Sequence, residues 1–198
     1  DAFTSNAVAG TGSITTNHRF LKANSGGTAT STAIVRDGTG TNIGWSVGSD
    51  PSVLNWSKRV VWDFIFEIAD NTSTGFCRVL WGPNGSDAIK DLDHKGIGIV
   101  VDNLALKLQT HDSTDLVEIA ASPTATLTVD LVYGMTIISD GAGNVEWFLN
   151  GVSQGTSAGG PVGNSDAAHH HMNLQAGNGA NAANQSIVVH SIYQGVAV

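Results

Sequence analysis

The sequence is poor in charge, in cysteine and in long hydrophobic runs. Only 13% of its 198 residues are charged, and the single cysteine, Cys77, excludes an internal disulfide. No apolar run reaches the ~18 residues that a membrane-spanning helix needs, so we expect no membrane insertion. Nine basic residues against seventeen acidic ones give a formal charge of -8. That balance argues against nucleic acid as a partner, because duplex binding needs a basic footprint.

Residues that favour helices are also scarce. Three of the seventeen acidic residues are glutamates, lysine is rare, and glycine is abundant, with 24 copies. No apolar stripe with a helical period is present, whereas apolar residues at every second position recur between turn-forming residues. The strongest such pattern is 58–69, where alternation places Val60, Trp62, Phe64, Phe66 and Ile68 on one face. The sequence therefore predicts an all-β protein whose core includes that face.

Further short apolar runs predict the other strands, so that the whole chain should have about twelve. The sequence contains no internal repeat and no linker. These runs lie at 32–35, 43–47, 74–81, 96–102, 104–110, 116–120, 125–139, 144–149, 172–176 and 186–193. A two-sheet sandwich accommodates this number of strands. We expect a single domain over 1–198, with 1–12 as an extended N-terminal arm. Cys77 lies in an apolar run, and we expect a buried, unreactive thiol.

Residues 135–151 carry a family resemblance. An alternating strand, Met-Thr-Ile-Ile-Ser, turns at Asp-Gly-Ala-Gly and returns through Asn-Val-Glu-Trp-Phe-Leu to Asn-Gly. This pattern resembles the central hairpin of laminin-G-like, concanavalin A-like jelly rolls, and 187–193 is similar to their final strand. The resemblance implies a two-sheet antiparallel jelly-roll sandwich. The family includes lectins, glycan hydrolases and lyases, adhesion modules, and domains of phage tails and capsids.

Three functions follow from this resemblance. The first is a non-enzymatic virion structural protein, a capsid decoration, tail or fibre component, as the small polar residues and glycine-rich loops suggest. It would be located in the virion or outside the cell, and its partners would be other virion proteins or copies of itself. The second is a carbohydrate-binding module or receptor-binding lectin domain, in which Trp45, Trp56 or Trp81 stacks on a sugar of a surface glycan. The third is a glycan hydrolase or lyase.

The third function needs paired carboxylates. Asp63 and Glu67 lie on one strand with Ile65 where the related pattern has an acid, and they are ~13 Å apart at ~3.3 Å per residue. That spacing does not match a catalytic pair. Glu67 and Glu146 could instead meet across a sheet, and the simpler alternative is that both are solvated, outward-facing acids.

Two clusters are candidates for metal binding. Asp91 and Asp93 occupy the first and third positions of a calcium-loop pattern, but Lys95 stands at its fifth position. An acidic turn is the alternative. His169 and His171, preceded by Asp166, point to the same side of an extended chain and could bind Zn²⁺ or Ni²⁺, although no Cys or Glu nearby completes a tetrahedral set. A site shared between three subunits and a simple polar loop are the alternatives. We expect no cofactor, with Ca²⁺ at Asp91 and Asp93 as the alternative.

Overall fold

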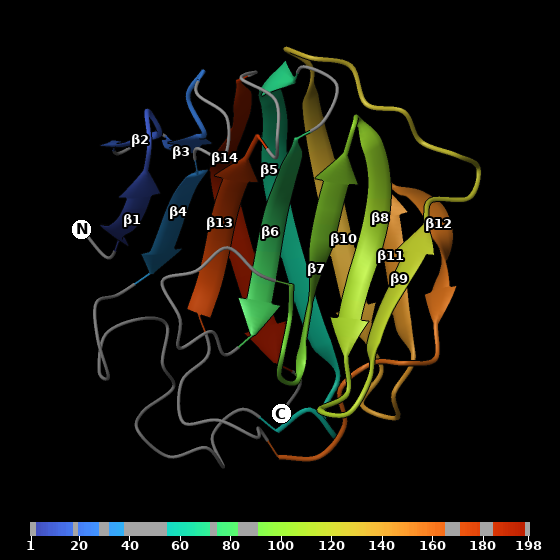
Figure 1. Ribbon diagram of the computed structural model, residues 1–198. Coiled ribbons are helices and arrows are strands. Elements are labelled where there is room, and N and C mark those ends of the chain that lie inside the picture. The colour runs from blue at the N-terminus through green and yellow to red at the C-terminus, as the bar shows by residue number, and fades with distance from the viewer. Residues whose placement is uncertain are drawn as a thin grey trace.

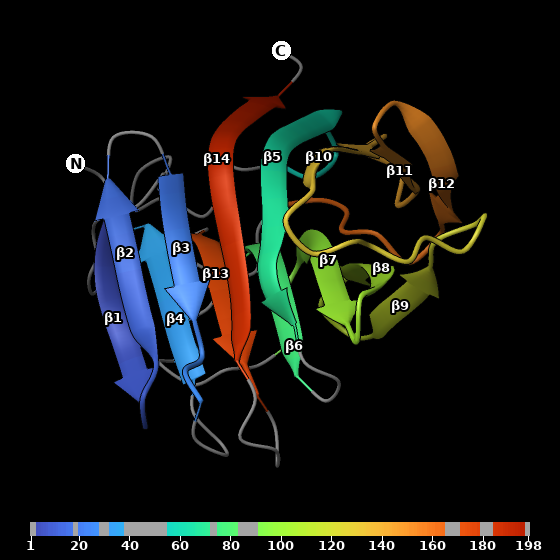
Figure 2. The same ribbon diagram turned by 90° about the horizontal axis from the view of Figure 1, so that it is seen from above.

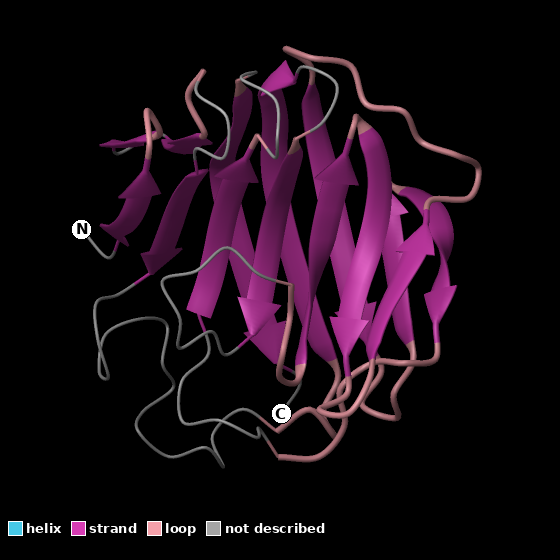
Figure 3. Cartoon of the chain, in the orientation of Figure 1, coloured by secondary structure: helices cyan, strands magenta, loops and turns pink. Residues whose placement is uncertain are grey.

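The chain folds into β-strands joined by loops (Figure 1). The computed structural model describes residues 3–17, 20–27, 32–37, 55–71, 75–82, 91–164, 171–178 and 184–196. Its strands are β1 (Phe3–Ala9), β2 (Ser13–Asn17), β3 (Phe20–Asn24), β4 (Thr32–Asp37), β5 (Val60–Asn71), β6 (Phe76–Gly82), β7 (Gly96–Asp102), β8 (Ala105–His111), β9 (Leu116–Ala120), β10 (Val132–Ser139), β11 (Val145–Leu149), β12 (Val152–Ser157), β13 (His171–Gly177) and β14 (Gln185–Val196). Within these ranges no residue is helical, so no helix there could cross a bilayer (Figure 3).

The strands form two seven-stranded sheets that lie face to face (Figure 2). The first sheet has the order β1-β4-β13-β6-β7-β8-β9, and the second has the order β12-β11-β10-β5-β14-β3-β2. Every strand pairing within them is antiparallel. Neighbours in each sheet come from distant parts of the sequence, as β14 beside β5 illustrates. The prediction of an all-β, two-sheet jelly-roll sandwich is confirmed.

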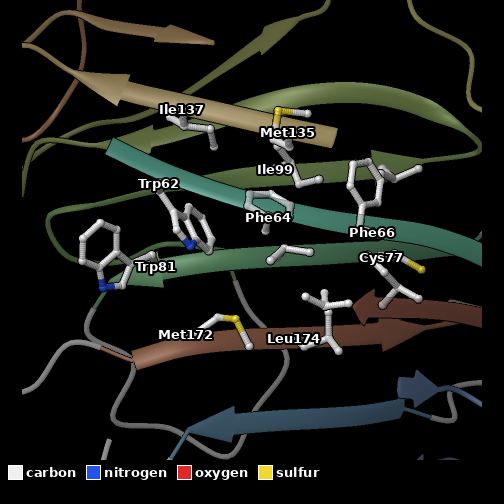
Figure 4. Close-up of a cluster of buried hydrophobic side chains, with 14 of the residues drawn as sticks. Trp62, Phe64, Phe66, Cys77, Trp81, Ile99, Met135, Ile137, Met172 and Leu174 are labelled. Atoms are coloured by element: carbon white, nitrogen blue, oxygen red, sulfur yellow. The ribbon is translucent and has the colours of Figure 1, made fainter. Parts of the chain in front are cut away.

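The core lies between the sheets, and β5 contributes its centre (Figure 4). Its inward face is the one expected from alternation: Val60, Trp62, Phe64, Phe66 and Ile68 are all buried. Trp62 contacts Phe64 within the strand, at 4.6 Å between ring centroids, and reaches Trp81 of the opposite sheet at 5.9 Å. Burying five large apolar side chains removes of the order of 10 kcal/mol of transfer free energy before chain entropy is subtracted. This face of β5 therefore joins the two sheets.

The hairpin of β10 and β11 has the expected form. Met135 pairs with Leu149, and Ser139 pairs with Val145, so the turn falls between 139 and 145. Gly141 and Gly143 have φ values of +84° and +95°, a conformation that side chains disfavour. Asp140 fixes the turn, since its Oδ1 accepts hydrogen bonds from the Ala142 and Asn144 amides at 2.7 and 3.0 Å.

Some expected boundaries differ from the structure. Residues 3–9, expected to form part of an extended arm, are strand β1 and pair with β4. Strand β12 was not expected, because its sequence, Val-Ser-Gln-Gly-Thr-Ser, has little apolar alternation. It forms because the Asn150–Gly151 turn returns the chain alongside β11. The strand expected at 43–47 lies outside the described residues.

Candidate functional site

A groove of about 530 Å³ lies on the outer face of the second sheet, over β10, β5 and β14. Its lining residues are Asp63, Phe64, Ile65, Gly134, Met135, Thr136, Asn150, Gly151, Ser191, Ile192 and Tyr193. Phe64 and Met135 turn their side chains into the core, so the groove has a floor of backbone and walls of outward-facing side chains. Its position follows from the register of the three strands.

A glycine forms the hollow. Gly134 of β10 lies opposite Ile65 of β5, and Ile65 lies opposite Ser191 of β14, so the three residues form one row across the outer face. A Cβ atom added to Gly134 would meet one neighbouring atom within 4 Å, Asn150 Oδ1 at 3.8 Å. The groove is therefore the volume that a larger side chain at this position would fill.

Asn150 closes one end of the groove. It begins the turn between β11 and β12 with φ of +50°, and Gly151 follows with φ of +78°, as a type I′ turn requires. Gly134 N donates to Asn150 Oδ1 at 2.8 Å, and Asn150 N donates to Gly134 O at 2.7 Å. The carboxamide oxygen is thus occupied. Its Nδ2 group has no hydrogen bond to any of the described residues, so it is available as a donor.

Asp63 supplies the one charged side chain of the lining. Its partner across the strands is Thr136, whose Oγ1 donates to Asp63 Oδ1 at 2.5 Å. This hydrogen bond fixes the carboxylate on the sheet surface. Oδ2 forms no hydrogen bond with the part of the chain that the structure describes, so it can accept one from a ligand.

Tyr193 forms the opposite wall. It lies across from Asp63 on β14, and 63% of its surface is exposed. Its ring leans over Gly195, where an added Cβ would approach the Tyr193 hydroxyl to 3.0 Å. The register of β14 shifts between Val189 and Ser191, so His190 is a β-bulge. Because of this bulge, Ser191 and Tyr193 face outward.

His190 extends the polar surface beyond the groove. Its Nε2 lies 3.1 Å from Glu67 Oε2, and the imidazole is the donor if that nitrogen carries the proton. Glu67 pairs with Val188 on one side and Val132 on the other. It lies four residues from Asp63, or ~13 Å along β5. The His190 and Glu67 pair thus neighbours the groove without lining it.

The strand register separates the proposed catalytic pair. Glu146 of β11 lies opposite Ile138 of β10, whereas Glu67 of β5 lies opposite Val132 of β10. Ile138 and Val132 are six residues apart, which is ~20 Å at ~3.3 Å per residue. Carboxylates that flank one glycosidic bond stand ~5–9.5 Å apart. Glu67 and Glu146 therefore cannot act together on one bond, and that hypothesis is wrong.

Two of the three tryptophans expected to stack on a sugar do not lie on the surface. Trp56 is 0% exposed and Trp81 is 4% exposed, and their ring centroids are 5.5 Å apart in the core. A sugar can stack only on an accessible ring face, so neither residue can serve in this way in the folded chain. The third, Trp45, lies outside the described residues. The exposed aromatic ring of the groove is instead Tyr193.

Asp91 takes part in a different interaction from the expected calcium site. Its Oδ1 lies 2.8 Å from Arg78 Nη2 and accepts a hydrogen bond from Gln109 Nε2 at 2.8 Å. Burial lowers the pKa of Arg78, and the charge of Asp91 opposes that effect. Asp93 lies 3.9 Å from His94 Nε2. Arg78 holds Asp91 by its positive charge, which disfavours a cation there.

The second expected metal site, at His169 and His171, lies largely outside the described residues. His169 is not among the described residues, and for His171 the backbone alone is described, paired with Gly82. In the part of the chain that the structure describes, no group of three or more His, Cys, Asp or Glu side chains could hold a metal ion.

The outer face of the first sheet has a buried polar residue of its own. Asn173 of β13 is 1% exposed, and among the described residues neither its Oδ1 nor its Nδ2 has a hydrogen-bond partner. The Nε atom of Arg78 on the adjacent strand is also buried without a partner. Buried polar groups are almost always satisfied by protein or water.

Most residues of the groove were not identified from the sequence. Asp63 was considered as part of a catalytic motif that failed, and Asn150 as a turn residue. A glycine inside a strand is itself a signal, because it suggests that something approaches the backbone closely. Gly134, in the middle of an apolar strand, carried that signal. No signal in the sequence indicated that the Tyr193 side chain faces outward, because its direction depends on the β-bulge at His190.

Comparison with known proteins supports the fold. No family model matches the chain, and no curated protein matches it either. The carbohydrate recognition domain of Emp47p superposes with a TM-score of 0.64 at 8% identity, over 100% of this chain and 90% of that one. An endo-β-1,4-glucuronan lyase from the fungus Trichoderma reesei gives 0.60 at 12% identity, over 98% and 91%.

A third similar structure is the carbohydrate-binding module CBM66 from Bacillus subtilis. It gives a TM-score of 0.53 at 11% identity, over 98% of this chain and 94% of that one. These similarities include binding domains and an enzyme, and at such identities they concern the fold. The chain has a concanavalin A-like jelly-roll fold, one that carbohydrate-binding domains and polysaccharide lyases share.

Proposed function

We propose that this protein is a glycan-binding jelly-roll domain and that the groove over β5, β10 and β14 is its binding site. The observation that carries the proposal is the pairing of exposed Tyr193 with Asp63 on adjacent strands of the groove lining. A sugar ring has apolar C–H faces and a rim of hydroxyls. The aromatic face of Tyr193 can pack against the C–H face of the sugar. For the sugar hydroxyls, Asp63 Oδ2 can accept a hydrogen bond and Asn150 Nδ2 can donate one. A few fixed polar groups beside apolar walls are typical of small-ligand sites.

We further propose that the site binds its glycan without cleaving it. Asp63 is the one carboxylate among the lining residues, and the usual glycosidase mechanism needs two. The similar structures named for carbohydrate recognition or binding support a binding role. A strand-built site also suits binding, since little chain entropy is lost when a ligand settles on a rigid surface.

The test is a panel of neutral and acidic oligosaccharides titrated by calorimetry, with and without EDTA. Tyr193→Ala and Gly134→Leu should each weaken binding by about tenfold or more, the first by removing the aromatic wall and the second by filling the hollow. Val152→Ser serves as the control, because Val152 is exposed on β12 outside the groove lining. Equal affinity for all four proteins would reject the groove as the site. Loss of binding in EDTA would instead favour a metal-dependent site elsewhere on the chain.

The same panel tests the absence of catalysis. New reducing ends and the ultraviolet absorbance of unsaturated products report hydrolysis and elimination, and neither should increase with time. An increase that Tyr193→Phe abolishes would make the protein an enzyme, with the Tyr193 hydroxyl in its mechanism.

The virion role remains a prediction from composition. It is compatible with glycan binding, because a receptor-binding domain on a particle surface would need such a groove. A stable higher-order assembly with no affinity for any glycan would favour a purely structural virion component. A monomer with glycan affinity would favour the binding role alone.

A further inference from the structure

We infer that the groove selects an uncharged glycan and discriminates against the same glycan when it carries uronic acids. This inference rests on the proposed function, and it names the ligand class that the charges of the site accept. It concerns Asp63, which is the only charged side chain among the lining residues.

No cationic group balances Asp63 within the groove. The lining contains no Lys, Arg or His. Arg59 precedes β5, four residues before Asp63 or ~13 Å along the strand, and no salt bridge joins these two side chains. His190 is held against Glu67, itself an acid. Lys22 lies on β3 in the row of Glu67, two rows away from Asp63. Among the described residues, the potential over the groove is therefore set by carboxylates.

A uronate ligand would place its carboxylate on this surface without a counter-charge. Like charges at close range repel, and displacing water from the groove would strengthen the repulsion. A neutral sugar carries no charge that Asp63 would repel. Its hydroxyl donates to Asp63 Oδ2, and a hydrogen bond to an ionised acceptor is roughly twice as strong as one between neutral groups. Thr136 holds the carboxylate in place through Oδ1, so Oδ2 is oriented before the ligand arrives.

The inference separates this chain from one of its structural neighbours. The glucuronan lyase is named for a polymer of uronic acid, whose every repeat carries a carboxylate. The two chains share a fold at 12% identity, which leaves their surfaces free to differ. In the groove lining, this chain presents Asp63 and no cationic side chain, an arrangement suited to hydroxyl-rich, uncharged partners.

The experiment compares matched ligands that differ in one functional group. Neutral β-1,4-linked gluco-, manno-, xylo- and galacto-oligosaccharides are measured by calorimetry, and the three hexose series are measured again after oxidation of C6 to the carboxylate. We expect a neutral ligand to bind at least tenfold more tightly than its oxidised form. Raising the salt concentration should reduce that ratio, because screening weakens the repulsion.

Variants assign the discrimination to Asp63. Asp63→Asn keeps an oxygen for Thr136 and removes the charge, so the ratio between neutral and oxidised ligands should fall at least fivefold. Glu146→Gln is the matched control, since Glu146 is exposed on the same sheet face, two strands from Asp63, and should leave the ratio unchanged. Oxidised ligands that bind as well as neutral ones would overturn this inference while the glycan-binding function stands. No binding of either class, in a protein with the circular dichroism of a folded sandwich, would reject both.

Discussion

At the scale of single residues, the environment of Cys77 determines its reactivity. The side chain is 1% exposed on the inner face of β6, and burial raises the pKa of its thiol to about 12. A buried thiol with so high a pKa forms almost no thiolate at pH 8, and the thiolate is the reactive form. In the unfolded chain the thiol returns to a pKa of roughly 8.5.

We therefore expect iodoacetamide at pH 8 to modify Cys77 only when the chain unfolds. Mass spectrometry after timed quenching should show an unmodified native protein and a fully modified protein in denaturant. Rapid stoichiometric modification of the native protein would contradict the burial of this residue. The sequence predicted this outcome, because an apolar run with alternating residues places Cys77 in a strand of the sandwich.

At the scale of elements, the turn between β10 and β11 makes stability depend on pH. The pKa of Asp140 lies below its ordinary value, chiefly because of the hydrogen bond from the Asn144 side chain, and then because of the Ala142 amide. A carboxylate whose pKa is depressed in the folded state contributes its stabilisation above its unfolded pKa of about 3.9. That contribution is lost as the pH falls through the lower, folded value.

Replacing Asp140 with Asn should thus lower stability at pH 7 and make stability less dependent on pH below about 4. Urea unfolding at a series of pH values from 7 to 2.5 measures both effects. Asp115→Asn is the control, since it removes an exposed acid that forms no hydrogen bond through its side chain in the described structure. If both variants lost the same stability over the same pH range, the turn hydrogen bonds would not be the cause.

Elements differed in how well the sequence predicted them. Strand β5 was predicted with its inward face correct, because five large apolar side chains at alternate positions allow one orientation only. Strand β12 was missed, since pairing with β11 rather than its own composition makes it a strand. The groove was missed for a similar reason. It depends on which residues of three separate strands share a row, and alternation within one strand does not fix that register.

At the scale of the whole molecule, one apolar cluster connects the two sheets. Trp56, Trp62 and Trp147 belong to it, each with 0% exposure, together with Trp81 at 4%. A single shared core leaves neither sheet able to bury its inner face alone. The sandwich should accordingly lose its secondary structure and its tryptophan burial in one transition.

We expect urea unfolding followed by far-ultraviolet circular dichroism and by tryptophan fluorescence to give the same midpoint. The Trp45→Phe variant removes the tryptophan that lies outside the described residues, so the remaining emission reports the core. Phe66→Ala should lower the common midpoint, since truncating a buried phenylalanine costs about 3–5 kcal/mol. Two midpoints that separate, with fluorescence changing first, would indicate sheets that unfold independently.

The β-bulge at His190 has an evolutionary consequence. Val189 and Ile192 both pack against the core although an odd number of positions separates them, so the bulge inverts the parity of everything that follows in β14. Loss of the codon for His190 would remove the bulge and leave a regular strand, with Ile192 still facing the core and Tyr193 still facing the surface. The neighbouring strands and their turns would remain unaltered. The bulge thus absorbs one extra residue, so lineages of this fold can gain or lose a residue at this point through a single in-frame event and keep the aromatic wall.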